Sequence, residues 1–271
     1  MKALLRAAAL AGFALFACIA QAQDAGASHA IGVVIMHGKG GSPQKHVDGL
    51  ASALQAKGAA VANLEMPWSG RREYDVSVNQ AEQEVLTSLQ GLRDKGAKKL
   101  FVAGHSQGGI FALYFGSQHA VDGVIAIAPG GNVASPVFQE QLREPLAKAR
   151  ELMAAGKGKE KARLADFEGS KGSFPVTTTP ENYLDWFATD GAMNQVKASR
   201  GLKATPVLYV APTRDYPGLQ RVKQQMFQAL PANPMSKMIE PSASHLEAPG
   251  AAAQDIWAWM QEVAARPAAP Q

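Results

Sequence analysis

Short apolar runs rich in β-branched residues recur along the chain and restrict its fold more than any other feature. Runs of this length without polar alternation predict strands that are buried on both faces, as in a parallel sheet. The clearest runs are 31–36 (IGVVIM), 99–103 (KLFVA), 124–128 (VIAIA) and 206–210 (PVLYV), and weaker candidates lie at 59–64 and 236–240.

Segments with a helical spacing of apolar residues separate these runs. They cover 46–57, 78–95, 110–119 and 251–265. The alternation of strand and helix predicts an α/β fold, with a mostly parallel central sheet and helices on both faces. Ligands of such sheets collect at the carboxyl ends of the strands, so the chemistry is expected in the loops that follow strands.

The stretch from about 133 to 203 interrupts the alternation. It has no convincing buried strand, but it contains a charged helical segment at 138–155, a Gly/Lys-rich link at 156–161 and an aromatic segment at 183–187. We expect an insertion that forms a cap over the carboxyl edge of the sheet. The alternative is an ordinary long connection without a role in substrate binding.

The first 22 residues have the features of a secretory signal. Lys2 and Arg6 precede a short apolar run at 9–20, and the sequence AQA at 20–22 fits a small-x-small cleavage site. The apolar run is shorter than the roughly 20 residues that span a bilayer, so no stable membrane span is expected. The sequence therefore predicts an exported protein, either periplasmic or secreted.

Cleavage after Ala22 would remove the single cysteine, Cys18. The mature chain could then form no disulfide and would depend on its core for stability. A lipoprotein processed at Cys18 is a minor alternative, because residues 15–17 resemble such a site only loosely. Residues 23–271 are expected to form one domain, since α/β folds often use roughly 200 to 250 residues in a single unit.

Charge and histidine distribution exclude two classes of function. The formal net charge is +4, and the basic residues are scattered rather than gathered into a stripe that would follow nucleic acid. The histidines are dispersed and the mature chain would lack cysteine, so no metal-ligand cluster is predicted.

A strong candidate nucleophile follows the second clear strand. The pentapeptide GHSQG at 104–108 fits Gly-x-Ser-x-Gly and stands between the predicted strand 99–103 and the predicted helix 110–119. In this setting Ser106 would occupy a tight, strained turn that presents its hydroxyl above the sheet, and the flanking glycines would avoid clashes.

A serine hydroxyl needs a base, and the base needs a carboxylate that orients it. His245 follows the last candidate strand and is the predicted base, while Asp215 follows the strand 206–210 and is the predicted carboxylate. Glu240 and Asp190 are weaker rivals, because the first would lie in or at the end of a strand and the second in the cap. The alternative role for Asp215 is a surface salt bridge, for example with Arg214.

These motifs resemble those of the α/β-hydrolase family over essentially residues 31–264. The sequences HGKGG at 37–41, GHSQGG at 104–109, APTRD at 211–215 and SHLEAPG at 244–250 stand at family-like positions. The order Ser, Asp, His along the chain is also that of the family. The resemblance implies esterase, lipase, thioesterase or amidase chemistry without a metal or an organic cofactor.

The resemblance also implies where the oxyanion of the tetrahedral intermediate would be bound. One donor is the main-chain N–H of Gln107, the residue after the nucleophile, and the other comes from the first-strand loop. We assign this second donor to Lys39, with Gly40 as the alternative. A phosphate-binding role for the loop is not favoured, because it lacks the spacing of a nucleotide loop.

The expected function is hydrolysis of a carboxylic ester in a small molecule, through an acyl-enzyme. Trp68 and Trp186 are the predicted substrate-binding residues, because aromatic side chains suit an apolar cleft. An amidase, peptidase or thioesterase with the same catalytic residues is one alternative. An exported binding protein that keeps the fold without catalysis is another.

Overall fold

Six strands form one parallel sheet in the computed structural model, which describes residues 30–203 and 205–266. Their spatial order is β2-β1-β3-β4-β7-β8, and every neighbouring pair is parallel. The mostly parallel α/β sheet predicted from the apolar runs is thereby confirmed. The strands are β1 (Ile31–Met36), β2 (Ala60–Leu64), β3 (Lys99–His105), β4 (Gly123–Ile127), β7 (Val207–Val210) and β8 (Lys237–Ile239). The predicted secretory signal and Cys18 lie outside the described residues.

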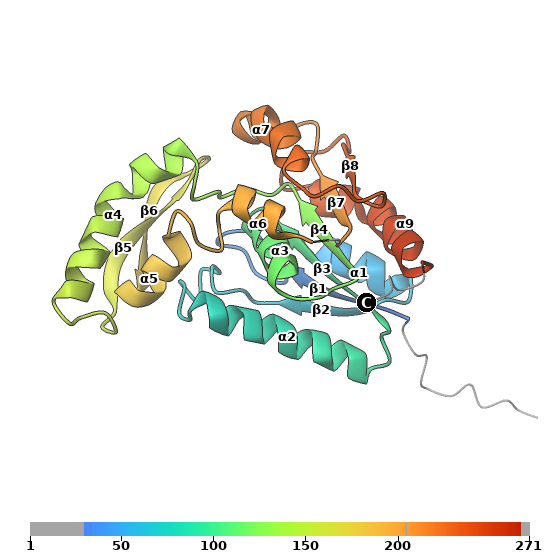
Figure 1. Cartoon of the computed structure of the whole chain (residues 1–271), viewed down its shortest axis with the longest axis horizontal. Coiled ribbons are helices and arrows are strands. Elements are labelled where there is room, and N and C mark those ends of the chain that lie inside the picture. Colours follow the sequence, from blue (N-terminus) through green and yellow to red (C-terminus); the bar gives the residue numbers. More distant parts are fainter. Residues whose placement is uncertain (1–29, 204, 267–271) are drawn as a thin grey trace, which may run out of the picture.

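Helices cover both faces of this sheet (Figure 1). Alternate residues of β1 divide between two cores: Val34 belongs to the cluster that includes α2 and α3, and Ile35 to the cluster that includes α1 and α9. This period of two is what a strand buried on both faces requires. The helices are α1 (Asp48–Ala56), α2 (Val78–Asp94), α3 (Gln107–Gln118), α7 (Pro217–Gln228), α8 (Ala248–Ala251) and α9 (Ala253–Ala264).

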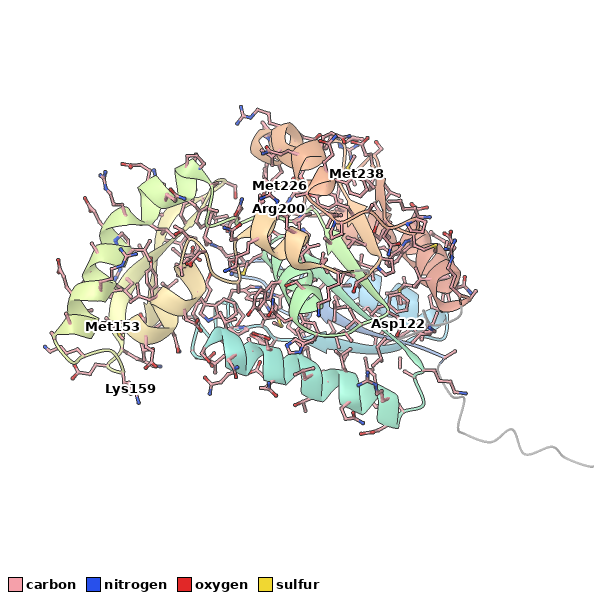
Figure 2. The ribbon with its side chains drawn as sticks, in the orientation of Figure 1. Asp122, Met153, Lys159, Arg200, Met226 and Met238 are labelled. Atoms are coloured by element: carbon pink, nitrogen blue, oxygen red, sulfur yellow. The ribbon has the colours of Figure 1, made fainter. Side chains whose placement is uncertain are left out.

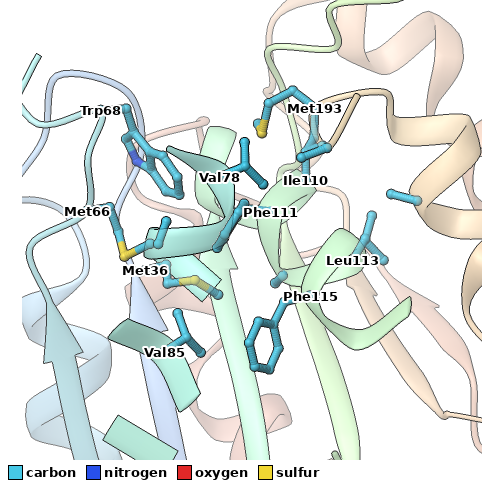
Figure 3. Packing of buried hydrophobic residues seen from close by; sticks show 14 of the residues in the cluster. Met36, Met66, Trp68, Val78, Val85, Ile110, Phe111, Leu113, Phe115 and Met193 are labelled. Carbon is cyan, nitrogen blue, oxygen red and sulfur yellow. The ribbon is translucent and has the colours of Figure 1, made fainter. Parts of the chain in front are cut away.

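The larger core lies where α2 and α3 pack on the sheet. Figure 3 shows Phe111 and Phe115 of α3 beside Val85 of α2 and Met36 of β1, and all four side chains are buried. Helix α2 begins with a capping box, in which Ser77 and Gln80 satisfy each other's main-chain N–H groups. The sequence segment predicted as helix at 78–95 thus has a defined start.

An inserted unit occupies the chain between β4 and β7. It contains α4 (Pro136–Ala154), the antiparallel hairpin of β5 (Ala162–Glu168) and β6 (Gly172–Thr178), and α5 (Pro180–Phe187); α6 (Gln195–Gly201) then returns to α3. In Figure 2, Asp122 marks the amino end of β4, and the unit with Met153 and Lys159 projects from the opposite edge of the sheet. The unit therefore lies beyond the carboxyl ends of the strands.

The hairpin in this unit differs from the sequence analysis, which found no convincing strand there. Buried residues alternate with partly or fully exposed ones, so that Leu164, Asp166, Val176 and Thr178 point inward. Two of these four are polar, and the strands therefore lack the continuous apolar run that identified the central strands.

No helix within residues 30–203 and 205–266 has the length and apolar character needed to cross a membrane.

Two helical glycines test how tightly the sheet and helices pack. Gly91→Ala in α2 is expected to raise the free energy of unfolding by about 0.5–1 kcal/mol, because alanine favours helix and its Cβ would meet nothing within 4 Å. Gly116→Ala in α3 would place Cβ 2.4 Å from Val124 Cγ2, and overpacking of about 1–3 kcal/mol outweighs the same helical gain. Denaturant unfolding should give shifts of opposite sign, and shifts of the same sign would contradict this packing.

Candidate active site

Ser106 occupies the turn between β3 and α3, with φ 55° and ψ −116°. A residue other than glycine pays on the order of 1–3 kcal/mol of backbone strain at these φ and ψ angles, so the turn must be held by its surroundings. The main chain of Ser106 donates to Ile127 O at 2.8 Å and accepts from Gly130 N at 3.1 Å. These bonds anchor the strained turn to β4 and the loop that follows it.

The glycines of this turn are required by close main-chain contacts. A Cβ on Gly104 would lie 1.9 Å from Gly108 O, and a Cβ on Gly108 would lie 2.5 Å from Met36 O. The end of β3, the start of α3 and the end of β1 therefore meet without room for side chains. The turn predicted from the pattern GHSQG is thus built by direct contact between main chains.

Main-chain hydrogen bonds align the two loops that carry Asp215 and His245. Thr213 N–H donates to Pro241 O at 2.9 Å and Arg214 N–H donates to Ala243 O at 3.0 Å, which extends the pairing of β7 with β8 beyond the strands. His245 Nδ1 consequently lies 2.7 Å from Asp215 Oδ1. Their side chains are 7% and 4% exposed, so this contact is largely shielded from water.

The other carboxylates near this edge have different partners. Arg214, the alternative partner of Asp215, lies 3.3 Å from Glu247, while Glu240 pairs with Lys223 and Asp190 is exposed. Among the carboxylates weighed from the sequence, Asp215 is the one that contacts His245.

The imidazole of His245 is close to two other rings. Its centroid is 4.8 Å from that of His105 and 4.6 Å from that of Tyr216. His105 Nε2–H donates to the main-chain oxygen of His245 at 2.9 Å. Burial lowers the pKa of His105 to about 3, so this side chain stays neutral and serves as a fixed donor. His105 immediately precedes Ser106, so this bond ties the serine turn to the main chain of His245. Within the described residues, no hydrogen bond joins the Ser106 hydroxyl to the His245 ring.

The loop after β1 passes directly beside Ser106. A Cβ on Gly38 would lie 3.1 Å from Ser106 Cβ. Gly40 N–H donates to Trp68 O at 2.9 Å and Gly41 N–H donates to Gly38 O at 3.0 Å. Within residues 30–203 and 205–266, the main-chain N–H groups of Lys39 and Gln107 have no main-chain acceptor.

His37 holds this loop through two hydrogen bonds of its ring. Its Nε2 accepts from Met66 N at 3.0 Å, and its Nδ1–H donates to Gly38 O at 2.7 Å. Burial lowers the pKa of His37, which favours the neutral ring that these two bonds require.

A polar cluster that the sequence did not predict joins the loop to the inserted unit. Lys39 Nζ donates to Asp166 Oδ1 at 2.5 Å, and Tyr74 Oη–H donates to Asp166 Oδ2 at 2.6 Å. Tyr74 Oη also lies 3.4 Å from Gln107 Oε1. Burial and the nearby carboxylate raise the pKa of Tyr74 well above its usual value, so it remains a donor. No sequence pattern relates Lys39 to Asp166, because 127 positions separate them.

The two tryptophans predicted to bind substrate lie in the core. Trp68 is 2% exposed and Trp186 is 0% exposed, and their ring centroids are 5.6 Å apart. Trp68 Nε1–H donates to His37 O at 2.8 Å, and Trp186 Nε1–H donates to Val76 O at 2.7 Å. Both indoles thus support the main chain around the site, and their role in substrate binding stays a prediction.

An open hollow of about 550 Å³ lies beside the loop after β1, lined by Gly40, Gly41, Gln44, Lys45, Glu65 and Arg71. It is distinct from a crevice of about 10 Å³ next to Asp215 and Leu219. No group of three or more His, Asp or Glu side chains in the described part of the chain has a metal-binding arrangement.

The buried His105 is expected to make stability depend on pH. Its pKa is about 3 in the folded protein against 6.5 for a free side chain, so between these values only the unfolded chain takes up the proton. Stability is therefore lost as the pH falls below 6.5, by at most about 1.4 kcal/mol per pH unit for this group.

His105→Gln, whose amide nitrogen can take the place of Nε2 as the donor to His245 O, should lose less stability between pH 7 and pH 5 than the unmodified protein. Denaturant unfolding at the two pH values measures this. Equal losses of unfolding free energy in both proteins would show that His105 does not contribute to the pH dependence of stability.

Several solved structures share this fold. One reported for LipS and LipT, two metagenome-derived lipolytic enzymes, is 16% identical with a TM-score of 0.60, over 87% of this chain and 95% of that chain. Est1E from Butyrivibrio proteoclasticus is 15% identical with a TM-score of 0.60, over 88% of this chain and 90% of that chain. The monoacylglycerol lipase of Paleococcus ferrophilus is 18% identical with a TM-score of 0.59, over 86% and 94% respectively. At these identities the likeness shows the fold alone.

No curated protein matches the sequence. A family model described as the alpha/beta hydrolase family matches residues 33–255, which include Lys39, Ser106, Asp215 and His245. The match covers most of the chain and agrees with the parallel sheet and the placement of the serine turn. The protein therefore belongs to the alpha/beta hydrolase family.

Proposed function

We propose that the protein is a serine hydrolase that cleaves carboxylic esters of small molecules through an acyl-enzyme. The observation that carries the proposal is the 2.7 Å contact between His245 Nδ1 and Asp215 Oδ1, at the sheet edge where the strained turn presents Ser106. Lipases and esterases among the similar folds agree with it.

The acid–base step follows from the tautomer that this contact selects. With Nδ1–H donating to Asp215, His245 Nε2 carries a lone pair and can take the proton of the Ser106 hydroxyl as its oxygen attacks the ester carbonyl. Asp215 stabilises the imidazolium that forms. His245 then gives the proton to the leaving alcohol, and water attacks the acyl-enzyme with His245 again as the base.

The negative oxygen of the tetrahedral intermediate is assigned to the main-chain N–H groups of Lys39 and Gln107. Both lie next to Ser106, and neither is engaged elsewhere within the described residues. Preorganised donors of this kind need no reorganisation as charge develops, and loss of one donor typically costs on the order of 10²–10³ in kcat. The bond to Trp68 O withdraws the N–H of Gly40, the alternative donor, from this role.

We also propose that the chain is exported to the periplasm or secreted, with its first 22 residues removed. Lys2, Arg6 and the apolar run at 9–20 support this. The amino-terminal sequence of the mature protein should begin at Gln23, and a start at Cys18 would instead indicate a lipoprotein.

Ser106→Ala is expected to abolish ester hydrolysis and labelling by a fluorophosphonate while circular dichroism and thermal unfolding remain close to those of the unmodified protein. The reason is that the proposed acyl-enzyme forms on the hydroxyl of this side chain. Failure of the unmodified, folded protein to be labelled would favour a binding protein without catalysis.

Asp215→Asn is expected to lower kcat on the order of 10⁴-fold, because the amide selects the wrong imidazole tautomer. Glu240→Gln is the matched control, since Glu240 is a nearby carboxylate paired with Lys223 and not with His245. Steady-state kinetics on a p-nitrophenyl ester measures both variants. Equal effects of the two substitutions would remove Asp215 from its assigned role.

Esters and amides distinguish the proposed reaction from its closest alternative. We expect p-nitrophenyl esters to be hydrolysed far faster than the matching p-nitroanilides, with thioesters assayed beside them. A higher kcat/KM for the anilides would indicate an amidase or peptidase that uses the same residues.

A further inference from the structure

Asp166 is a fully buried carboxylate in β5, at a position that the sequence did not single out. It is 0% exposed, and its partner Lys39 is 7% exposed. Lys39 Nζ also donates to Phe167 O at 2.9 Å and lies 4.9 Å from the ring centroid of Phe138. The ion pair is thus enclosed by the inserted unit, although the lysine comes from the loop after β1.

Removing two charges from water is costly, and a buried ion pair is seldom a better source of stability than apolar residues of the same size. What such a pair does provide is a defined geometry. Asp166 accepts at both oxygens, from Lys39 at 2.5 Å and from Tyr74 at 2.6 Å. The carboxylate therefore fixes two side chains that come from different loops of the central domain.

Both of these contacts lead to the assigned oxyanion donors. Lys39 carries one of the two main-chain N–H groups. Tyr74 Oη lies 3.4 Å and 3.3 Å from the amide oxygen and nitrogen of Gln107, the residue that carries the other. Gln107 is itself 3% exposed, so its side chain has little freedom.

We propose that Asp166, Tyr74 and the side chain of Lys39 are positioning residues, which hold the N–H groups of Lys39 and Gln107 in place through a hairpin of the inserted unit. This inference rests on the proposed esterase function. It makes stabilisation of the oxyanion dependent on docking of β5 against the loop after β1, while proton transfer between Ser106, His245 and Asp215 does not involve the cluster.

Two variants test this cluster without removing either main-chain donor. Tyr74→Phe keeps the ring and deletes the hydroxyl. The double variant Lys39→Met with Asp166→Asn removes both charges together, which avoids leaving one buried charge uncompensated. A single Asp166→Asn variant is less informative, because it leaves the buried lysine without its counter-charge and can unfold for that reason.

We expect kcat for a p-nitrophenyl ester to fall on the order of tenfold in the double variant and several-fold in Tyr74→Phe, below the loss caused by removing a donor outright. KM should stay within about twofold of the value for the unmodified protein, since the hydrogen bonds to the oxyanion strengthen only in the transition state.

A trifluoromethyl ketone gives the second measurement. Ser106 Oγ adds to its carbonyl carbon as the hydroxyl proton passes to His245, and the former carbonyl oxygen becomes the hemiketal anion that takes the place of the oxyanion. The affinity of the protein for this inhibitor should fall by the same factor as kcat. A loss of substrate binding alone would instead raise KM and leave kcat unchanged.

Tyr114→Phe is the matched control. Tyr114 donates to Glu82 at 2.9 Å, and Glu82 also pairs with His119, in a tyrosine–carboxylate–base cluster toward the carboxyl end of α3. Tyr114 follows Gln107, the first residue of α3, by two helical turns, a rise of about 10 Å. The control is expected to keep the kcat and inhibitor affinity of the unmodified protein.

Unchanged kcat and inhibitor affinity in folded Tyr74→Phe and in the folded double variant would overturn the inference and leave the esterase proposal intact. A change in KM alone, or an equal loss in Tyr114→Phe, would also overturn it. Absence of ester hydrolysis and of fluorophosphonate labelling in the unmodified protein would instead overturn the proposed function, and the inference with it.

Discussion

The close approach of three main-chain segments around the serine is the constraint on which the rest of the site depends. A Cβ on Gly104 would collide with Gly108 O, and one on Gly108 would collide with Met36 O. β1, β3 and α3 therefore meet without intervening side chains, at the turn where Ser106 has positive φ. The same contact brings the loop after β1 against Ser106, so the proposed nucleophile lies close to the loop that carries Lys39 because of the packing of the sheet.

The sequence was sufficient for the central sheet and for the placement of the serine turn. Strands buried on both faces leave a strong signal, since runs such as 31–36 and 99–103 have few alternative structures. Asp215 and His245 could be chosen because parallel strands deliver their following loops to one edge. Their direct contact requires the pairing of the two loops beyond β7 and β8, which no single residue encodes.

The inserted unit shows why the remainder could not be predicted. Asp166 and Thr178 are polar residues that point inward, and their burial is decided by partners far away in the chain. The two tryptophans are likewise placed by distant partners. Trp68 and Trp186 contact each other inside the core, and their role in substrate binding stays a prediction. Aromatic composition indicates burial without saying whether protein or ligand covers the ring.

The loops after β7 and β8 are joined to each other and not to the inserted unit by the bonds of Thr213 and Arg214. Asp215 and His245, the proposed acid–base pair, are therefore carried by these paired loops, whereas Lys39, a proposed oxyanion donor, contacts the inserted unit through its side chain. Evolution could exchange or resize the segment between β4 and β7, and the contact between Asp215 and His245 would be inherited unchanged.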